Sequence, residues 1–113
     1  MEINTYNHPY VTAEVTAQGL LFDNPEQVVQ CMVYLYYQGY EKIIFYQHHF
    51  PADFFQLSNG KLGEVLQKFS NFRMRLAIIG DFQNLQSQSL TDFIRESNRG
   101  NWAHFVSSLE NAL

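Results

Sequence analysis

The chain has 113 residues, 46% of them hydrophobic and 16% aromatic, which excludes collagen-like, low-complexity and disulfide-rich proteins. Only 16% are charged, and the net charge of −4 argues against a general nucleic-acid binder, which needs clustered cations. This length predicts one domain, residues 1–113, and no apolar run approaches the ~20 residues that cross a bilayer. No basic and apolar signal segment opens the sequence, so we expect a cytoplasmic protein that binds no membrane.

The first part of the chain predicts a strand, a helix and a second strand. Tyr10–Val15 has the residue types of a strand, and Leu20–Phe22 either extends a hairpin from it or leads into the helix. Asn24 before a proline predicts the start of that helix, and Gly39 supplies the positive-φ stop. The apolar run Lys42–Tyr46 is typical of a strand buried on both faces.

The later part of the chain predicts two more strands and three helical segments. A second helix carries its apolar residues on one stripe, which includes Leu66. The remaining predicted elements are the strands Met74–Ile79 and Trp102–Val106, a helix opened by Ser89 after the polar loop Asn84–Gln88, and a C-terminal helical stub capped by Ser107.

This order of elements predicts an α/β fold. Strands that alternate with helices through short links form a mostly parallel sheet, here of four or five strands, flanked by helices. In shorthand the order is β(β)αβαβαβα. The residues expected in the core are Val28, Met32, Leu35, Ile43, Ile44, Phe45, Val65, Leu66, Phe69, Leu76, Ala77, Ile78, Phe93 and Ile94.

Candidate catalytic residues follow two of the predicted strands. Ligands of open α/β sheets bind beyond the carboxyl ends of the strands. His48 and His49 follow one strand, and Asp81 follows the next. Imidazoles near a carboxylate fit general base or hydrolase chemistry, but no nucleophile elbow is present. On an extended chain the two imidazoles would point to opposite sides, so we expect no metal site. Surface histidines and an ordinary turn aspartate are the alternative.

A second candidate is the loop Ser58, Asn59, Gly60 and Lys61 before the second helix. A helix N-terminus beside a lysine can hold an anion, but the sequence lacks both glycine-rich phosphate fingerprints. An ordinary turn with flexible glycines has the same composition. The one cysteine, Cys31, cannot form an internal disulfide and lies in the most apolar helix, which predicts a buried, inert thiol.

The chain resembles an uncharacterised bacterial family called domain of unknown function 4180. The resemblance is carried by Phe54–Leu57, Gly60–Phe69, Leu76–Phe82 and Ser89–Gly100, and it extends over nearly the whole chain. It implies a small single-domain protein without an assigned activity. This chain has Asn59 where such proteins usually carry threonine, which weakens any role for a hydroxyl there.

A looser resemblance is to the STAS domains of anti-anti-sigma regulators. The segment Ser58–Gly63 stands where those domains have a loop that opens a helix. In that family a serine of this loop is phosphorylated, which switches the binding of a kinase partner. The resemblance implies that Ser58 is the candidate for such a switch.

We therefore expect a non-catalytic regulatory or protein-binding module of STAS-like architecture, without a cofactor. The alternative is a small hydrolase-type enzyme with a pocket built from His48 or His49 and Asp81. Eighteen aromatic residues compete for a small interior at low charge density, which predicts self-association as a homodimer. A further protein partner fits the same composition, whereas nucleic acid does not.

Overall fold

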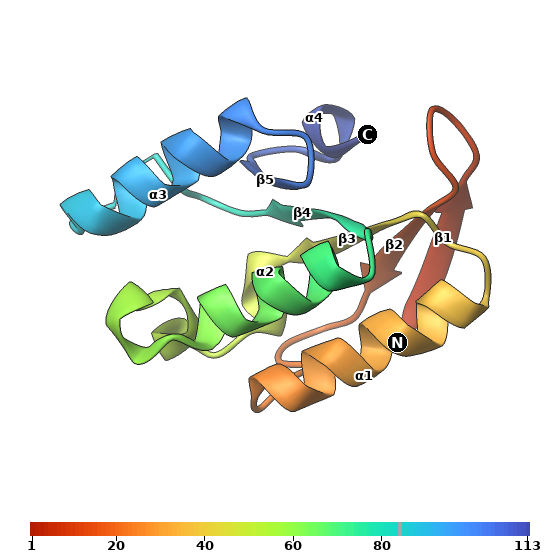
Figure 1. Cartoon of the computed structure of the whole chain (residues 1–113), viewed down its shortest axis with the longest axis horizontal. Coiled ribbons are helices and arrows are strands. Elements are labelled where there is room, and N and C mark those ends of the chain that lie inside the picture. The colour runs from red at the N-terminus through yellow and green to blue at the C-terminus, as the bar shows by residue number, and fades with distance from the viewer. Residues whose placement is uncertain (84) are drawn as a thin grey trace.

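The computed structural model describes residues 1–83 and 85–113, and its chain alternates strands with helices after an N-terminal hairpin (Figure 1). The described residues form the strands β1 (Glu2–Tyr6), β2 (Thr12–Thr16), β3 (Lys42–Tyr46), β4 (Arg75–Ile79) and β5 (Ala103–Val106). They also form the helices α1 (Pro25–Tyr37), α2 (Lys61–Asn71), α3 (Gln88–Arg99) and α4 (Leu109–Ala112). Short 3-10 turns lie between β3 and α2, at Gln47–His49, Ala52–Phe55 and Leu57–Asn59.

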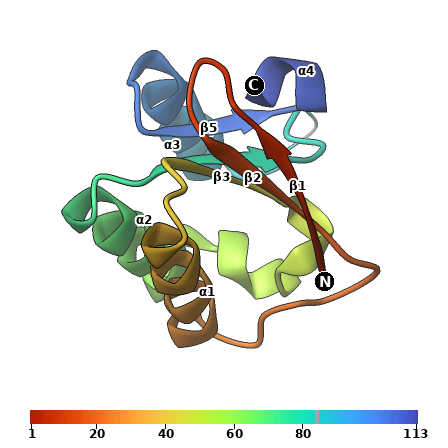
Figure 2. The ribbon, with the colours of Figure 1, turned by 90° about the vertical axis from the view of Figure 1, so that its right-hand side faces the viewer.

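The strands lie side by side in chain order, from β1 at one edge of the sheet to β5 at the other. β1 pairs antiparallel with β2, and the other neighbours pair in parallel. Right-handed crossovers between successive parallel strands place their helices on one face. Accordingly α1, α2 and α3 flank one face of the sheet, and α4 lies on the other (Figure 2). The prediction of a mostly parallel α/β fold is confirmed.

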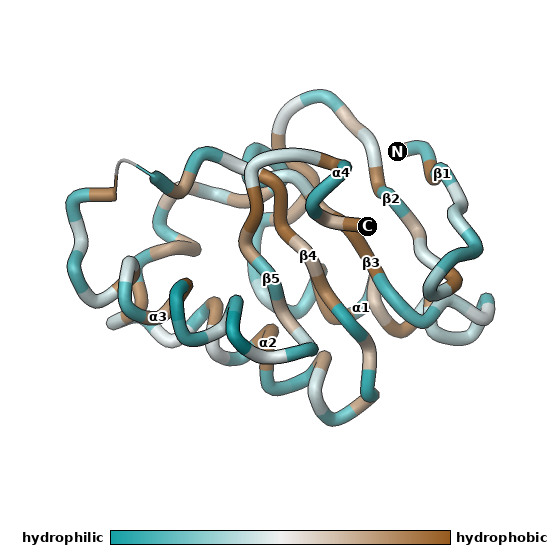
Figure 3. Tube along the Cα trace, turned by 90° about the horizontal axis from the view of Figure 1, so that it is seen from above, coloured by the Kyte–Doolittle hydropathy of each residue, from teal (hydrophilic) through white to brown (hydrophobic). Residues whose placement is uncertain are grey.

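The core is divided unequally by the sheet because successive strand residues point to opposite faces. Ile43 and Phe45 pack toward α1–α3 in the larger cluster, whereas Ile44 belongs to a small cluster with Ala112 of α4. Seen from the α4 side, the hydrophobic stretches of β3, β4 and β5 lie beside that short helix (Figure 3). The radius of gyration of 13.0 Å is that of one compact domain of this length.

Local capping explains where the helices begin and end. The Oδ1 of Asn24 accepts a hydrogen bond from the N–H of Gln27 at 3.0 Å, and Gly39 has a φ of 93°, so both predictions for α1 are confirmed. The predicted capping residues of α3 and α4 were wrong. Ser87, not Ser89, caps α3, since its Oγ accepts from the N–H of Leu90. The predicted loop Asn84–Gln88 begins at a residue outside the described part of the chain.

The cap of α4 was predicted one residue early, at Ser107. Ser108 holds that position, because its Oγ accepts a hydrogen bond from the N–H of Asn111 at 3.1 Å. At both helix starts, a second serine one or two residues away carries a hydroxyl group that could also cap the helix. The backbone conformation therefore decides which one caps.

The N-terminal hairpin was not predicted in this form. The antiparallel partner of β2 is Glu2–Tyr6, which precedes it, whereas Leu20–Phe22 leads into α1. There the N–H groups of Leu21 and Phe22 both donate to the carbonyl of His49. Polar Glu2–Tyr6 lacks the apolar pattern of a buried strand because it lies exposed at the sheet edge.

The predicted core needs two corrections. Leu66 and Phe93 are only partly buried, whereas Leu62 is fully buried and was not in the predicted set. The inner stripe of α2 runs through Leu62, Val65 and Phe69, which leaves Leu66 at its flank. Among the described residues, no helix has the length and apolar character needed to cross a membrane.

Candidate functional site

The two histidines after β3 lie in the 3-10 turn Gln47–His49, so they are not on an extended chain as predicted. The turn brings their ring centroids to 4.6 Å. His48 is exposed, and its Nε2 lies 3.0 Å from the carbonyl oxygen of Ala17. His49 is fully buried, and its Nδ1 accepts the N–H of Tyr46 at 3.1 Å. The ring proton of neutral His49 therefore resides on Nε2, which has no partner among the described residues.

Burial, together with the neighbouring His48, lowers the pKa of His49 to about 4. The imidazole of His49 is therefore neutral at pH 7. Full burial also keeps its unpartnered Nε2 away from solvent and substrate, so the residue has the features of a core histidine.

Asp81 occupies a tight turn after β4. Its Oδ1 accepts the N–H of Gln83 at 3.4 Å, and its own N–H donates to the side chain of Gln47 at 3.0 Å. In the described part of the chain, no hydrogen bond or ion pair joins Asp81 to His48 or His49. The geometry of Asp81 is that of a turn residue, and it orients neither imidazole.

Within residues 1–83 and 85–113, no three His, Cys, Asp or Glu side chains lie close enough together to hold a metal ion.

The Ser58 loop lies where the sequence placed it, directly before α2. Ser58 is exposed in the 3-10 turn Leu57–Asn59, and Gly60, with a φ of 76°, is the N-cap of α2. The Oδ1 of Asn59 accepts the N–H of Lys61 at 2.9 Å. The Lys61 ammonium forms an ion pair with Asp53 at 2.7 Å. The loop is thus built of turn contacts, and its cation already has a carboxylate partner.

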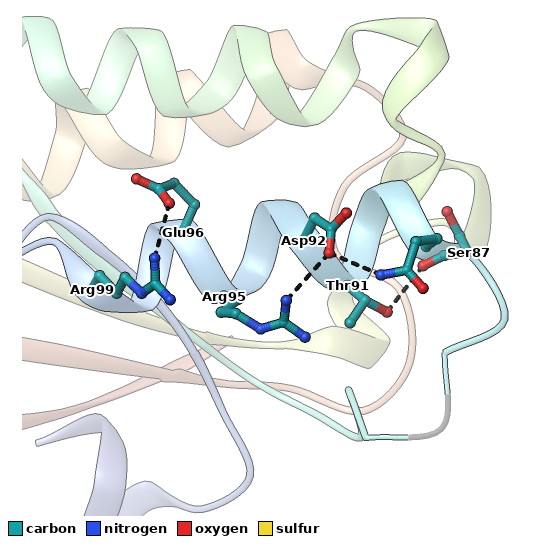
Figure 4. A network of polar contacts seen from close by, with 7 residues as sticks. Ser87, Thr91, Asp92, Arg95, Glu96 and Arg99 are labelled. Atoms are coloured by element: carbon teal, nitrogen blue, oxygen red, sulfur yellow. Dashed lines mark hydrogen bonds and ion pairs between the residues drawn. The ribbon is translucent and has the colours of Figure 1, made fainter.

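The polar face of α3 carries a row of charges that pair locally (Figure 4). Arg95 lies 3.4 Å from Asp92, and Arg99 lies 3.6 Å from Glu96, each three residues apart. Exposed pairs of this kind contribute only a few tenths of a kcal/mol. This face therefore leaves no concentrated charge for a ligand.

A buried carboxylate that the sequence analysis missed joins the first three strands. Glu14 is 4% exposed, and its Oε1 accepts from Asn4 at 3.2 Å and from the Tyr6 hydroxyl at 2.9 Å. Its Oε2 accepts from the Tyr46 hydroxyl at 2.6 Å. Burial raises the pKa of Glu14, but these hydrogen bonds outweigh burial and lower it below its usual value. Burial and the same carboxylate raise the pKa of Tyr46 to about 12. This network holds β1 rigidly against β2 and β3.

The two edges of the sheet differ in how they are protected. At the β5 edge, Asn98 of α3 donates to the carbonyl of Phe105 at 3.0 Å and accepts its N–H at 2.7 Å. Ser97 donates to the carbonyl of Ala103 at 2.6 Å. At the other edge, no described element pairs with the outer side of β1, which lies uncovered in Figure 2. An uncovered edge strand is a template for another strand.

The uncovered edge continues into an apolar hollow on the outer side of α1. This hollow, of about 610 Å³, is lined by the largely apolar residues Met1, Leu21, Phe22, Cys31 and Tyr34, and by the polar residues Asp23, Gln27 and Gln30. Met1 is 64% exposed and Tyr34 is 58% exposed. Cys31 is half-buried, less buried than predicted, and burial raises the pKa of its thiol to about 11. The thiol therefore stays protonated, and the hollow presents apolar surface.

The fold and these surfaces define a small α/β domain with one protected and one open sheet edge. The chain belongs to the family described as Domain of unknown function (DUF4180), which matches residues 7–113 and thus the fold from β2 to α4. No curated protein and no solved structure matches the chain.

Proposed function

We propose that this chain is a non-catalytic protein-binding module that binds a second copy of itself through β1. The observation that supports this most directly is the asymmetry of the sheet. Side chains of α3 satisfy the backbone of β5, whereas β1 has no outer neighbour among the described elements. The hydrogen-bond network around Glu14 fixes β1 in place, so pairing with another strand requires little ordering.

A second copy fits this edge because β1 is complementary to itself. In an antiparallel two-fold pair centred on Asn4, Glu2 of each copy lies opposite Tyr6 of the other, so no like charges meet. The sheet would continue through both copies, and the hollow beside α1 would flank the junction on each side. Apolar surface from Met1, Leu21 and Tyr34 would then leave water.

The proposal extends to a regulatory role of STAS type in the bacterial cytoplasm. Ser58 is exposed and precedes the N-terminus of α2, where a phosphate group would meet N–H groups and compete with Asp53 for Lys61. Phosphorylation would therefore exchange one ion pair for another at this loop.

Sedimentation velocity across a wide concentration range tests the dimer. We expect a dimer for the parent chain, and a dissociation constant at least about tenfold higher for Asn4→Lys, because this substitution removes the amide that Asn4 donates to Glu14 and places two long side chains opposite each other at the centre of the pair. Asn4→Gln is the matched neutral variant and should retain the dimer. Asn71→Lys adds the same charge at the exposed end of α2 and should also retain it.

A monomer at every concentration would overturn the self-association proposal, as would an equal effect of Asn4→Lys and Asn71→Lys. Ser58→Asp belongs in the same series. A changed dissociation constant would support regulation of the dimer, and an unchanged one would remove the regulatory role from the proposal.

A further inference from the structure

The amino edge of the sheet, where β3, β4 and β5 begin, holds a polar hollow of about 230 Å³. Its lining residues include the basic residues Lys42, Arg75 and His104, the aromatic residues Tyr10 and Trp102, and Asn111 and Leu113 from the C-terminal end of the chain. It lies at the end of the strands opposite to His48 and Asp81, where the general rule for α/β sheets does not place ligands.

Lys42 is the more buried of the two cations in this hollow. Lys42 is 7% exposed as a residue, and its ammonium donates to the carbonyl of Ala112 at the end of α4. An ammonium has three N–H donors, and this carbonyl accounts for one. Among the described residues, no carboxylate oxygen lies within 4.0 Å of it. Burial, and then the nearby charge of Arg75, lower the pKa of Lys42.

Arg75 is the register neighbour of Lys42 on β4 and is held rigidly. Its guanidinium carbon lies 4.1 Å from the centre of the Tyr10 ring and 4.5 Å from that of Trp102. One N–H donates to the carbonyl of Asn101 at 2.6 Å. In the part of the chain that the structure describes, Arg75 also has no carboxylate within 4.0 Å. The remaining guanidinium donors are thus oriented without an anionic partner.

We infer that this hollow is a binding site for a small oxyanion, a carboxylate or a phosphate. Two neighbouring cations repel each other, and an anion between them would remove that repulsion and accept their free N–H groups. His104 adds a polar wall, with its Nε2 held 2.6 Å from the carbonyl oxygen of Gly100. The hollow is smaller than the ~300–1,000 Å³ of sites for drug-sized ligands, which suits a compact anion.

The site is independent of the proposed dimer, because its cations lie on β3 and β4 and the dimer edge is β1. A bound anion would stabilise the folded chain, since it binds the folded state and not the unfolded one. Trp102, the sole tryptophan of the sequence, lines the hollow and reports on its occupancy by fluorescence.

The test is a titration with inorganic phosphate and, separately, with acetate, at an ionic strength held constant with sodium chloride. Trp102 emission and the melting temperature are both recorded. We expect a saturable emission change and a rise in melting temperature, with a dissociation constant in the range of about 0.1–10 mM. Lys42→Gln, which keeps a donor for Ala112, should weaken binding at least about tenfold. Lys68→Gln removes an exposed cation of α2 that belongs to neither proposed site, and it should leave binding unchanged.

No saturable change with either anion would overturn the inference, as would equal weakening by Lys42→Gln and Lys68→Gln. Saturation by phosphate alone assigns a phosphate ligand, saturation by acetate alone assigns a carboxylate, and saturation by both supports an oxyanion site, whose ligand is then the anion with the lower dissociation constant. Arg75→Gln repeats the test if Lys42→Gln does not fold. Asn4→Lys should retain the phosphate response, so failure of the dimer and failure of this site are separable.

Discussion

Two buried ionisable side chains, His49 and Glu14, are sensitive to acid over different pH ranges. His49 has a pKa of about 4 in the folded chain, below the ordinary 6.5, because burial disfavours its cation. Glu14 has a pKa below its ordinary 4.5, because its hydrogen bonds favour the anion despite burial. The stability that Glu14 contributes is therefore present above about pH 4.5 and is lost as the pH falls below it.

His49 makes the fold weaken in mild acid. Between about pH 6.5 and pH 4 the unfolded chain binds a proton that the folded chain excludes, so the free energy of unfolding falls as the pH falls. At about 1.4 kcal/mol for each pKa unit, the loss is on the order of 2–3 kcal/mol. Urea unfolding at several pH values measures this loss in the free energy of unfolding.

His49→Asn is the matched variant, because its Oδ1 can accept the N–H of Tyr46 and the side chain does not titrate. We expect this variant to be less stable at neutral pH but nearly insensitive to pH between about 6.5 and 4.5. If the parent and His49→Asn lost stability equally over this range, another group would be responsible for the acid sensitivity.

Helix α3 protects the last strand through side chains instead of through a further strand. Asn98 supplies both the acceptor and the donor that Phe105 would find in a neighbouring strand. The Phe105 residue is 3% exposed, so its backbone groups depend on this amide. Asn98→Ala should lower the free energy of unfolding by about 1–3 kcal/mol and increase aggregation, because the edge becomes available.

Asn71→Ala at the end of α2 is the control for this prediction. The amide of Asn71 accepts only from the exposed side chain of Gln67, at 3.0 Å, so its loss should cost less than about 0.5 kcal/mol. Urea unfolding and light scattering compare the two variants. If both substitutions lowered the free energy of unfolding equally, water would form the hydrogen bonds of the Phe105 backbone as well as Asn98 does, and the prediction would be wrong.

At the scale of the whole molecule, the parallel part of the fold could be predicted because its strands are short apolar runs between clear helix signals. Lys42–Tyr46 coincides with β3, and Met74–Ile79 begins one residue before β4. β1 could not be predicted in this way, because no residue of the edge strand Glu2–Tyr6 is fully buried and only Ile3 and Tyr6 are partly buried, so its sequence has no alternating apolar pattern.

The candidate sites were harder to predict because they depend on which strands are neighbours. The rule for α/β sheets predicts a ligand site at the carboxyl edge, but there His49 is buried and Asp81 forms a turn. The sequence did contain a signal for the opposite edge, since a cation precedes each of two apolar runs, at Lys42 and Arg75. Their proximity follows only from the register of β3 and β4.

Most of the stability of the molecule should reside between the sheet and α1–α3. Leu62 of α2 is fully buried in that large cluster, whereas Leu109 of α4 packs, partly exposed, on a small cluster that includes Ile44 and Ile79. Leu62→Ala should therefore cost about 2–5 kcal/mol, and Leu109→Ala less than about 1.5 kcal/mol. Urea unfolding of both variants, with equal slopes, measures the two costs. If Leu109→Ala cost as much as Leu62→Ala, the α4 face would contribute to the core as strongly as the three-helix face, and the unequal division of the core would not determine stability.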